Sequence, residues 1–312
     1  GEFKESLPAA IGAAIDYDRT DCVVNVMPKP RAKHHILDTL GAIVCGSSLK
    51  PGRLAKAFAK ELRDLPGMAQ ALMKHGTCGF TSALVASGAT PIKNWLLAGD
   101  QAFPGVKQVA DGDAVIRFQT RKYGCANCPI ACGGICDVSA GKYPVGEVHK
   151  PEYETIGAFG PLCLCDDLET IIKLHDMCNR SGLDTISSGH VLAFAMECFE
   201  QGILTAADTD GIRITWGNGP AMVALLDKVI RREGIGDLLA DGVKAAASRI
   251  GQGAAACAMH VGGQEPGLHN ALFLPSRGTG FVCDPTPGRH TAAPMARIDG
   301  GPGAYAPYPE LR

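Results

Sequence analysis

Three cysteines in a short turn-forming stretch carry the clearest chemical signal in the chain. Cys125, Cys128 and Cys132 follow the spacing C-x2-C-x3-C, with Pro129 after the second cysteine and two glycines after the third. Glycine allows the backbone to approach a bound group closely, and cysteine thiolates are the usual ligands of iron–sulfur clusters. The spacing therefore predicts that three sulfurs converge on a metal centre, with a cubane iron–sulfur cluster as the favoured group.

Two other interpretations of these cysteines stay open. A mononuclear zinc site usually brings a second C-x2-C or a histidine pair about 12 to 20 residues later. The segment that runs on to Tyr153 offers only Cys136 and His149. The three thiols could also be ordinary buried side chains, because free cysteine often behaves as a small hydrophobic residue.

Composition narrows the class of protein. The chain has 312 residues, about two average domains, and its net charge of -2 argues against a nucleic-acid binder. It has no apolar run long enough to cross a bilayer and no signal-peptide pattern, so we expect a cytoplasmic protein without a membrane segment. In that compartment an odd count of 13 cysteines favours metal ligation or free thiols over disulfides.

The pattern of apolar residues, glycines and prolines predicts a mainly helical chain. A β-leaning run at 21–27 stops at two prolines, and a helix is expected at 51–64. Segments with capping residues at the start and glycine at the end predict four more helices, at 168–180, 189–201, 220–233 and 237–250. These helices should pack against one another rather than on a parallel sheet.

The end of the chain has a different character. From residue 254 onward the sequence is rich in glycine, proline and histidine, as in 262–269 and 284–291. Loops of this kind more often line a site than build a core. The chain starts at Gly1 and stops at Arg312 without any capping or tail signal, so we expect a piece of a longer protein.

Four motifs in this order resemble the aldehyde:ferredoxin oxidoreductase family, whose members are tungsten or molybdenum enzymes with a bis-pterin cofactor and a 4Fe–4S cluster. The resemblance extends over about residues 30 to 312. The motifs are the three cysteines, Pro151-Glu152-Tyr153-Glu154-Thr155, the stretch from Asn179 to Ser187, and Asp284-Pro285-Thr286-Pro287-Gly288-Arg289-His290.

The resemblance implies a division of the chain. Residues 1–50 would be a short remnant of the N-terminal β domain that cradles the pterins. Residues 51–255 would form the helical domain with the cysteine motif, and residues 256–312 the start of the C-terminal helical domain with its site-lining loops. Residues 35–50 depart from the family pattern, because the arginine of its phosphate-binding segment is missing. The chain by itself is therefore expected to show no turnover.

By the same resemblance, Cys125, Cys128 and Cys132 would be three of the four cluster ligands. The fourth would lie beyond Arg312, with Cys136 as the alternative within the chain. Cys163 and Cys165 are expected to be buried small hydrophobic residues.

The family's pterin-binding motif corresponds to Asn179, Gly182, Leu183 and Asp184. Its first position is an aspartate in the family and an asparagine here, which keeps an acceptor and loses the charge. Gly182 could alternatively be no more than a helix cap.

Glu154 and His290 are the catalytic residues that the resemblance implies. The spacing of Glu154 ahead of the pterin motif fits the family better than that of Glu152. A glutamate in a dry site can give or take a proton, and imidazole titrates near neutrality. His290 would be the partner acid or base, or would orient the substrate carbonyl, with His269 as a weaker candidate.

The implied activity is oxidation of an aldehyde to a carboxylic acid. Electrons would pass through the cluster to ferredoxin or an iron–sulfur subunit, and the resemblance allows a homodimer. Alternatives are a benzoyl-CoA reductase-type catalytic subunit acting on an aromatic thioester, a pterin-free electron-transfer or scaffold subunit, and a non-catalytic helical domain with structural zinc. The sequence does not choose among the substrates.

Overall fold

The computed structural model describes residues 49–64, 66–126 and 128–291. The chain divides into two compact units, residues 1–69 and 70–312, and each is considered by itself. In the first unit, helix α4 (Lys50–Asp64) confirms the helix expected at 51–64. The β-leaning run at 21–27 and all but the last two residues of the expected β-domain remnant lie outside the described residues, so these expectations stay untested.

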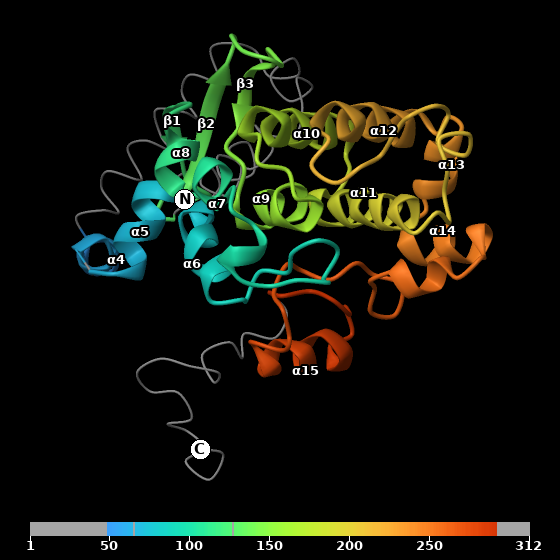
Figure 1. Cartoon of the computed structure of the whole chain (residues 1–312). Helices are drawn as coiled ribbons and strands as arrows, with labels where there is room; N and C mark the ends of the chain where they lie inside the picture. Colours follow the sequence, from blue (N-terminus) through green and yellow to red (C-terminus); the bar gives the residue numbers. More distant parts are fainter. Residues whose placement is uncertain (1–48, 65, 127, 292–312) are drawn as a thin grey trace, which may run out of the picture. The chain divides into compact units, whose positions relative to one another are not determined.

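Four helices form the body of the second unit and confirm the mainly helical fold. They are α9 (Tyr153–Phe159), α10 (Leu168–Ser181), α11 (Thr185–Glu200) and α12 (Gly219–Arg231). Helix α9 packs on α11, and α10 packs on α12, so that the four lie in two adjacent layers (Figure 1). Asp167 caps the start of α10 by accepting a hydrogen bond from the Glu169 N–H, and Gly182 ends the helix in the left-handed conformation.

Helix α11 is the centre of the core. Leu192, Phe194 and Met196 are fully buried, and apolar residues cover most of its circumference. A helix that is apolar all round must have neighbours on every side. On the side of α9 the two backbones come close, because a Cβ on Gly189 would lie 2.6 Å from the Cβ of Ala158.

Two helix boundaries differ from the expectation. Helix α11 begins at Thr185, not at residue 189, because Asp184 accepts a hydrogen bond from the Ser187 N–H at 2.8 Å and so caps the helix. The single helix expected at 237–250 is wrong. The chain forms α13 (Ile235–Leu239) and α14 (Val243–Ile250), separated by Gly242 with φ +86°. The Glu265 carboxylate accepts a hydrogen bond from the Val243 N–H at 2.8 Å, which stabilises the second start.

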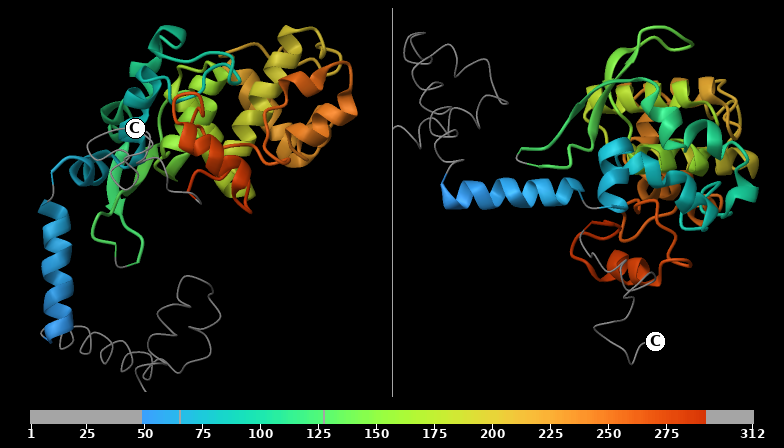
Figure 2. Two further views of the ribbon diagram at one scale, coloured as in Figure 1. Left: turned by 90° about the horizontal axis from the view of Figure 1, so that it is seen from below. Right: turned by 90° about the vertical axis from the view of Figure 1, so that its left-hand side faces the viewer.

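A small antiparallel sheet, which the sequence did not predict, carries the cysteine turn. Strands β1 (Gln119–Tyr123), β2 (Gly133–Val138) and β3 (Gly146–His149) lie in the order β1-β2-β3. The cysteine turn, residues 124–132, joins β1 to β2, and the hairpin extends away from the helices (Figure 2). At its base Tyr123 pairs with Gly133, where a Cβ would lie 2.6 Å from the tyrosine ring. The sheet thus presents the cysteines at its end.

Shorter elements complete the described part of the chain. They are α5 (Met68–His75), η1 (Thr77–Phe80), α6 (Thr81–Ala86), η2 (Asp100–Ala102), α7 (Val106–Val109), α8 (Gly112–Ile116), η3 (Pro161–Cys163), η4 (Ala254–Cys257) and α15 (Pro275–Cys283). No helix among the described residues has the length and apolar character needed to cross a membrane.

Replacing Leu192 by aspartate tests the core assignment. The Leu192 side chain is fully buried in α11, so Leu192→Asp would place an unpaired charge in the core. We expect the free energy of unfolding to fall by about 3 kcal/mol or more. Ala224→Asp, at an exposed position within α12, is the matched control and should cost less than about 1 kcal/mol. Equal denaturant midpoints for the two variants would contradict the assignment.

Candidate active site

Glu154 lies in the first turn of α9 and meets two histidines from the C-terminal loops. Its Oε2 accepts a hydrogen bond from the Leu268 N–H at 2.8 Å. Its Oε1 lies 3.2 Å from Nε2 of His269 and 3.3 Å from Nδ1 of His290. In the described part of the chain, these three residues form the one group of histidine, cysteine or acidic side chains whose ligand atoms all lie within 4.8 Å of one another.

The histidines are held by the packing of their loops against α9. The Tyr153 hydroxyl lies 3.0 Å from Oγ1 of Thr90 and donates a hydrogen bond to the Leu268 carbonyl. The His269 ring stands between the rings of Tyr153 and His290, with centroids 5.1 Å from each. Gly267 allows this packing, because a Cβ there would lie 2.8 Å from Nδ1 of His290.

The protonation states follow from this geometry. Burial raises the pKa of Glu154, but the close polar contact with His269, the positive charge that either histidine gains when protonated, and the Leu268 N–H outweigh it, so that this pKa lies below its ordinary value. Burial lowers the pKa of His290, and the Glu154 carboxylate opposes that shift only in part. Near neutral pH the site therefore contains an ionised carboxylate beside a neutral imidazole, a pair able to accept protons.

Two atoms of the site are left to contact a further group. Oε1 of Glu154 and Nδ1 of His269 are buried and form no hydrogen bond within the described residues. The two histidine nitrogens near Oε1 lie at ion-pair distance without hydrogen-bond geometry. A substrate or cofactor atom would find an acceptor there.

The cysteine turn has features of a site that binds metal through thiolates. Its three sulfurs are, however, too far apart to bind one metal ion together. The Cys125 side chain is exposed, those of Cys128 and Cys132 are half-buried, and all three are free. The N–H groups of Ile130 and Ala131 lower the pKa of Cys128. The sulfurs are not within 4.8 Å of one another as a set. A cubane binds its thiolates at separate iron atoms, so this turn fits such a cluster better than a mononuclear metal.

The other cysteines named from the sequence lie in the core. Cys136 in β2 is fully buried, and burial raises its pKa to about 11, so the protonated thiol is favoured. Its placement does not support the alternative that it is the fourth cluster ligand. Cys163 and Cys165 are also fully buried, as expected.

Two of the four residues of the pterin motif line a pocket, and the other two do not. Leu183 and Asp184 line a pocket of about 230 Å³ together with Ser187, Asp241 and Glu265. Asn179 and Gly182 do not line it. Asn179 is exposed and contacts His175, and Gly182 caps α10. Glu265 was missed as a site residue, because its position in a glycine-rich loop gives no signal of spacing.

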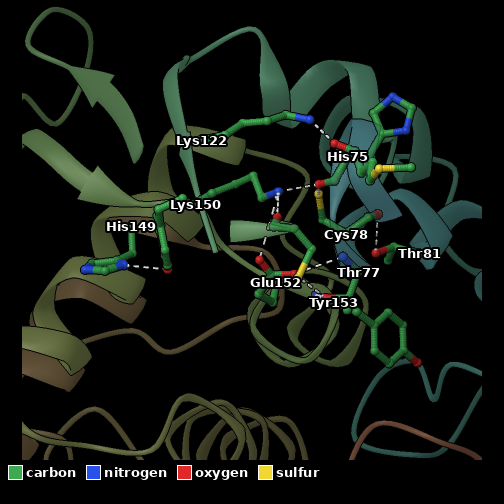
Figure 3. Close-up of polar contacts among 12 residues, drawn as sticks. His75, Thr77, Cys78, Thr81, Lys122, His149, Lys150, Glu152 and Tyr153 are labelled. Atoms are coloured by element: carbon green, nitrogen blue, oxygen red, sulfur yellow. Dashed lines mark hydrogen bonds and ion pairs between the residues drawn. The ribbon is translucent and has the colours of Figure 1, made fainter. Parts of the chain in front are cut away.

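A partly buried polar network, also missed from the sequence, joins the cysteine turn to α9 (Figure 3). The Lys150 ammonium donates hydrogen bonds to the carbonyls of Cys132 and His75, and lies 4.0 Å from the Glu152 carboxylate. Glu152 in turn accepts hydrogen bonds from the N–H and hydroxyl of Thr77. These residues come together through the fold, and their sequence spacing gives no sign of it.

The contact between Glu154 and His290 can be tested by titration. Because the Glu154 carboxylate raises the pKa of His290, Glu154→Gln should lower that pKa further. NMR of protein labelled with ¹³C in its histidine rings would follow the change. Glu152→Gln, which changes the same charge at a residue with no contact to either histidine in the site, is the control. An unchanged His290 pKa in Glu154→Gln would show that the two groups do not meet.

Comparisons with known proteins identify the family of the chain. The sequence model of the family described as "Aldehyde ferredoxin oxidoreductase, domains 2 & 3" matches residues 53–310. The tungsten-containing aldehyde ferredoxin oxidoreductase of Pyrococcus furiosus is 33% identical over 183 residues, which are 58% of this chain and 29% of that protein. The enzyme of the same name from Thermococcus kodakarensis is 33% identical over 184 residues, again 58% and 29%.

A second protein of Pyrococcus furiosus, the "Aliphatic sulfonate oxidoreductase, WOR-like subunit", is 31% identical over 188 residues, 57% of this chain and 29% of that one. Among solved structures, the active site complex BamBC of benzoyl coenzyme A reductase with 1,5-dienoyl-CoA has a TM-score of 0.56 at 23% identity, covering 77% of this chain and 36% of that chain. This likeness shows the fold. The match spans less than a third of the length of each curated relative. The family model covers most of this chain, so the chain belongs to the aldehyde ferredoxin oxidoreductase family and corresponds to its domains 2 and 3.

Proposed function

We propose that this chain is part of a tungsten (or molybdenum) pterin-dependent oxidoreductase that oxidises an aldehyde to a carboxylic acid. The observation that carries the proposal is the buried Glu154 carboxylate between His269 and His290, in a chain of this family. The relatives' names supply the tungsten and the aldehyde, and this chain supplies groups that suit the reaction.

The reaction releases protons and needs groups that receive them. Oxidation of an aldehyde with one water yields a carboxylic acid, two electrons and two protons. When bound, the metal–pterin group would take the two electrons and the cluster would pass them on singly. Glu154, kept ionised, and His290, kept neutral, are bases that can receive the protons. His269, whose Nε2 faces the same carboxylate oxygen, would orient Glu154.

The cysteine turn would hold the iron–sulfur cluster. Cys125, Cys128 and Cys132 supply three thiolates, and the peptide N–H groups beside Cys128 stabilise its charged form. We expect the fourth ligand beyond the described residues, since Cys136 is buried in the core. Electrons would leave the cluster for ferredoxin or an iron–sulfur subunit.

The pocket at Leu183 and Asp184 would accept part of the pterin. A pterin ring presents N–H donors, and the pocket is lined by the carboxylates of Asp184, Asp241 and Glu265. The first of these already caps α11 through one oxygen, so its second oxygen is the one left for a ligand. Asn179 and Gly182 would then shape the turn rather than contact the ring.

Metal analysis and turnover of the complete gene product, purified without oxygen, test the proposal. We expect tungsten or molybdenum, with iron and sulfide near four per chain, as a cubane requires. Glu154→Gln and His290→Phe should each lower kcat for an aldehyde by about 100-fold, the range for loss of a general acid or base, with metal content unchanged. Glu147→Gln, which removes the same charge as Glu154→Gln at an exposed residue of β3, should keep wild-type turnover.

Other results would favour the competing functions. Stoichiometric zinc without sulfide would indicate a structural metal domain, and iron and sulfide alone an electron carrier. Reduction of an aromatic thioester in place of aldehyde oxidation would indicate the benzoyl-CoA reductase-type activity. If either Glu154→Gln or His290→Phe kept wild-type turnover at full metal occupancy, the replaced residue would line the site without taking part in catalysis.

A further inference from the structure

Lys150 is a charged residue whose side chain is buried, which is rare for a lysine. Its side chain is 1% exposed, and lysine is almost never buried to this extent unless it is paired. Its ammonium lies 2.7 Å from the Cys132 carbonyl and 2.5 Å from the His75 carbonyl, and 4.0 Å from Oε1 of Glu152. The two carbonyls accept hydrogen bonds from the ammonium, and the Glu152 carboxylate lies at ion-pair distance from it.

The surroundings are shaped to hold this ammonium group. Gly76 has φ +78°, and a Cβ there would lie 2.4 Å from the Lys150 nitrogen and 2.7 Å from the Cys132 carbonyl oxygen. Any other residue would displace both the lysine nitrogen and the Cys132 carbonyl of the cysteine turn. The Lys150 N–H also donates to the Gly134 carbonyl at 2.8 Å, which joins its backbone to β2 directly after the turn.

Glu152, the partner of Lys150, is fixed on its other side. Its Oε2 accepts hydrogen bonds from the Thr77 N–H at 2.9 Å and the Thr77 hydroxyl at 2.5 Å. The same hydroxyl accepts a hydrogen bond from the Tyr153 N–H at 2.9 Å. In Figure 3 the three labelled side chains of Lys150, Glu152 and Thr77 point toward one another. The two opposite charges are therefore held in position by the first turn of α9 and by η1.

Both charges act on the cysteine turn. The Lys150 ammonium donates a hydrogen bond to the Cys132 carbonyl at 2.7 Å, and the Glu152 carboxylate lies 4.0 Å from that ammonium. The Lys150 charge is away from bulk water and is screened little, whereas the Glu152 side chain is 39% exposed and is screened more, so a cluster bound to these sulfurs should feel the lysine more strongly than the glutamate.

We propose that Lys150 and Glu152 are an electrostatic pair that sets the reduction potential of the cluster at Cys125, Cys128 and Cys132. Reduction adds one negative charge to a cluster, so the lysine favours the reduced form and the glutamate favours the oxidised form. The inference deepens the proposed function and rests on it, because it takes a cluster at this turn. Lys150 and Glu152 are positioning and tuning residues, not ligands.

The test is the potential of the cluster in variants of the complete gene product, read by redox titration with EPR detection of the reduced cluster. Lys150→Met should lower the potential, Glu152→Gln should raise it, and Lys150→Arg should stay near wild type. A merely structural role would not move the two variants in opposite directions. Iron and sulfide content, measured on the same samples, shows that each variant holds its cluster.

The same sheet provides matched controls. Arg121 and Glu147 form an ion pair at 3.4 Å whose side chains are 64% and 61% exposed. Arg121→Met and Glu147→Gln change the charge as the two test variants do, but in a place screened by water, and should leave the potential unchanged.

The outcomes separate the inference from the proposed function. Two results, in proteins that hold a full cluster, would overturn the inference alone. The reduction potential could shift in the same direction in both test variants, or its shifts could be no larger than those of the controls. Should Lys150→Met fail to fold or lose its cluster, the rise expected in Glu152→Gln decides by itself. A wild-type protein without iron and sulfide would overturn both.

Discussion

The docking of the C-terminal loops depends on one buried carboxylate. An ionised glutamate away from water is strongly unfavourable unless it is paired, and Glu154 finds its partners more than 100 residues further along the chain. The Leu268 N–H donates a hydrogen bond to one oxygen of Glu154, and His269 and His290 face the other oxygen at ion-pair distance. The Tyr153 hydroxyl binds the same loop through the Leu268 carbonyl. The loops after α14 are thus held by polar contacts to the start of α9 as well as by apolar burial.

Helix α9 places two kinds of chemistry next to each other. The residue just before it, Glu152, belongs to the network that reaches the cysteine turn, and Glu154, two residues later, belongs to the histidine cluster. Successive side chains at the start of a helix point in different directions, so neighbouring residues can serve opposite sides. In the proposed enzyme, one helical turn would connect the region of electron transfer with the region of proton transfer.

The helices could be predicted from local capping residues. Features that depend on contacts between residues distant in the sequence could not be predicted. The aspartate and glycine caps of α10 can be seen in the sequence, whereas the break at Gly242 depends on Glu265 from a distant loop. The strands beside the cysteine turn were missed because Gly133 and its neighbour weaken the β pattern, and Tyr123 covers the gap only in the folded sheet. Family motifs indicated Glu154 and His290, but nothing in the spacing indicated the burial of Lys150.

The glycine at position 76 has a consequence for how this sequence can diverge. Its φ of +78° and the short distance from its missing Cβ to the Lys150 nitrogen make the two positions dependent on each other. A descendant that shortens the lysine removes only one of two clashes, because a Cβ at position 76 would still lie 2.7 Å from the Cys132 carbonyl oxygen. Replacement of Lys150 alone should therefore not free position 76 to change, and the glycine should persist for as long as the cysteine turn keeps its place.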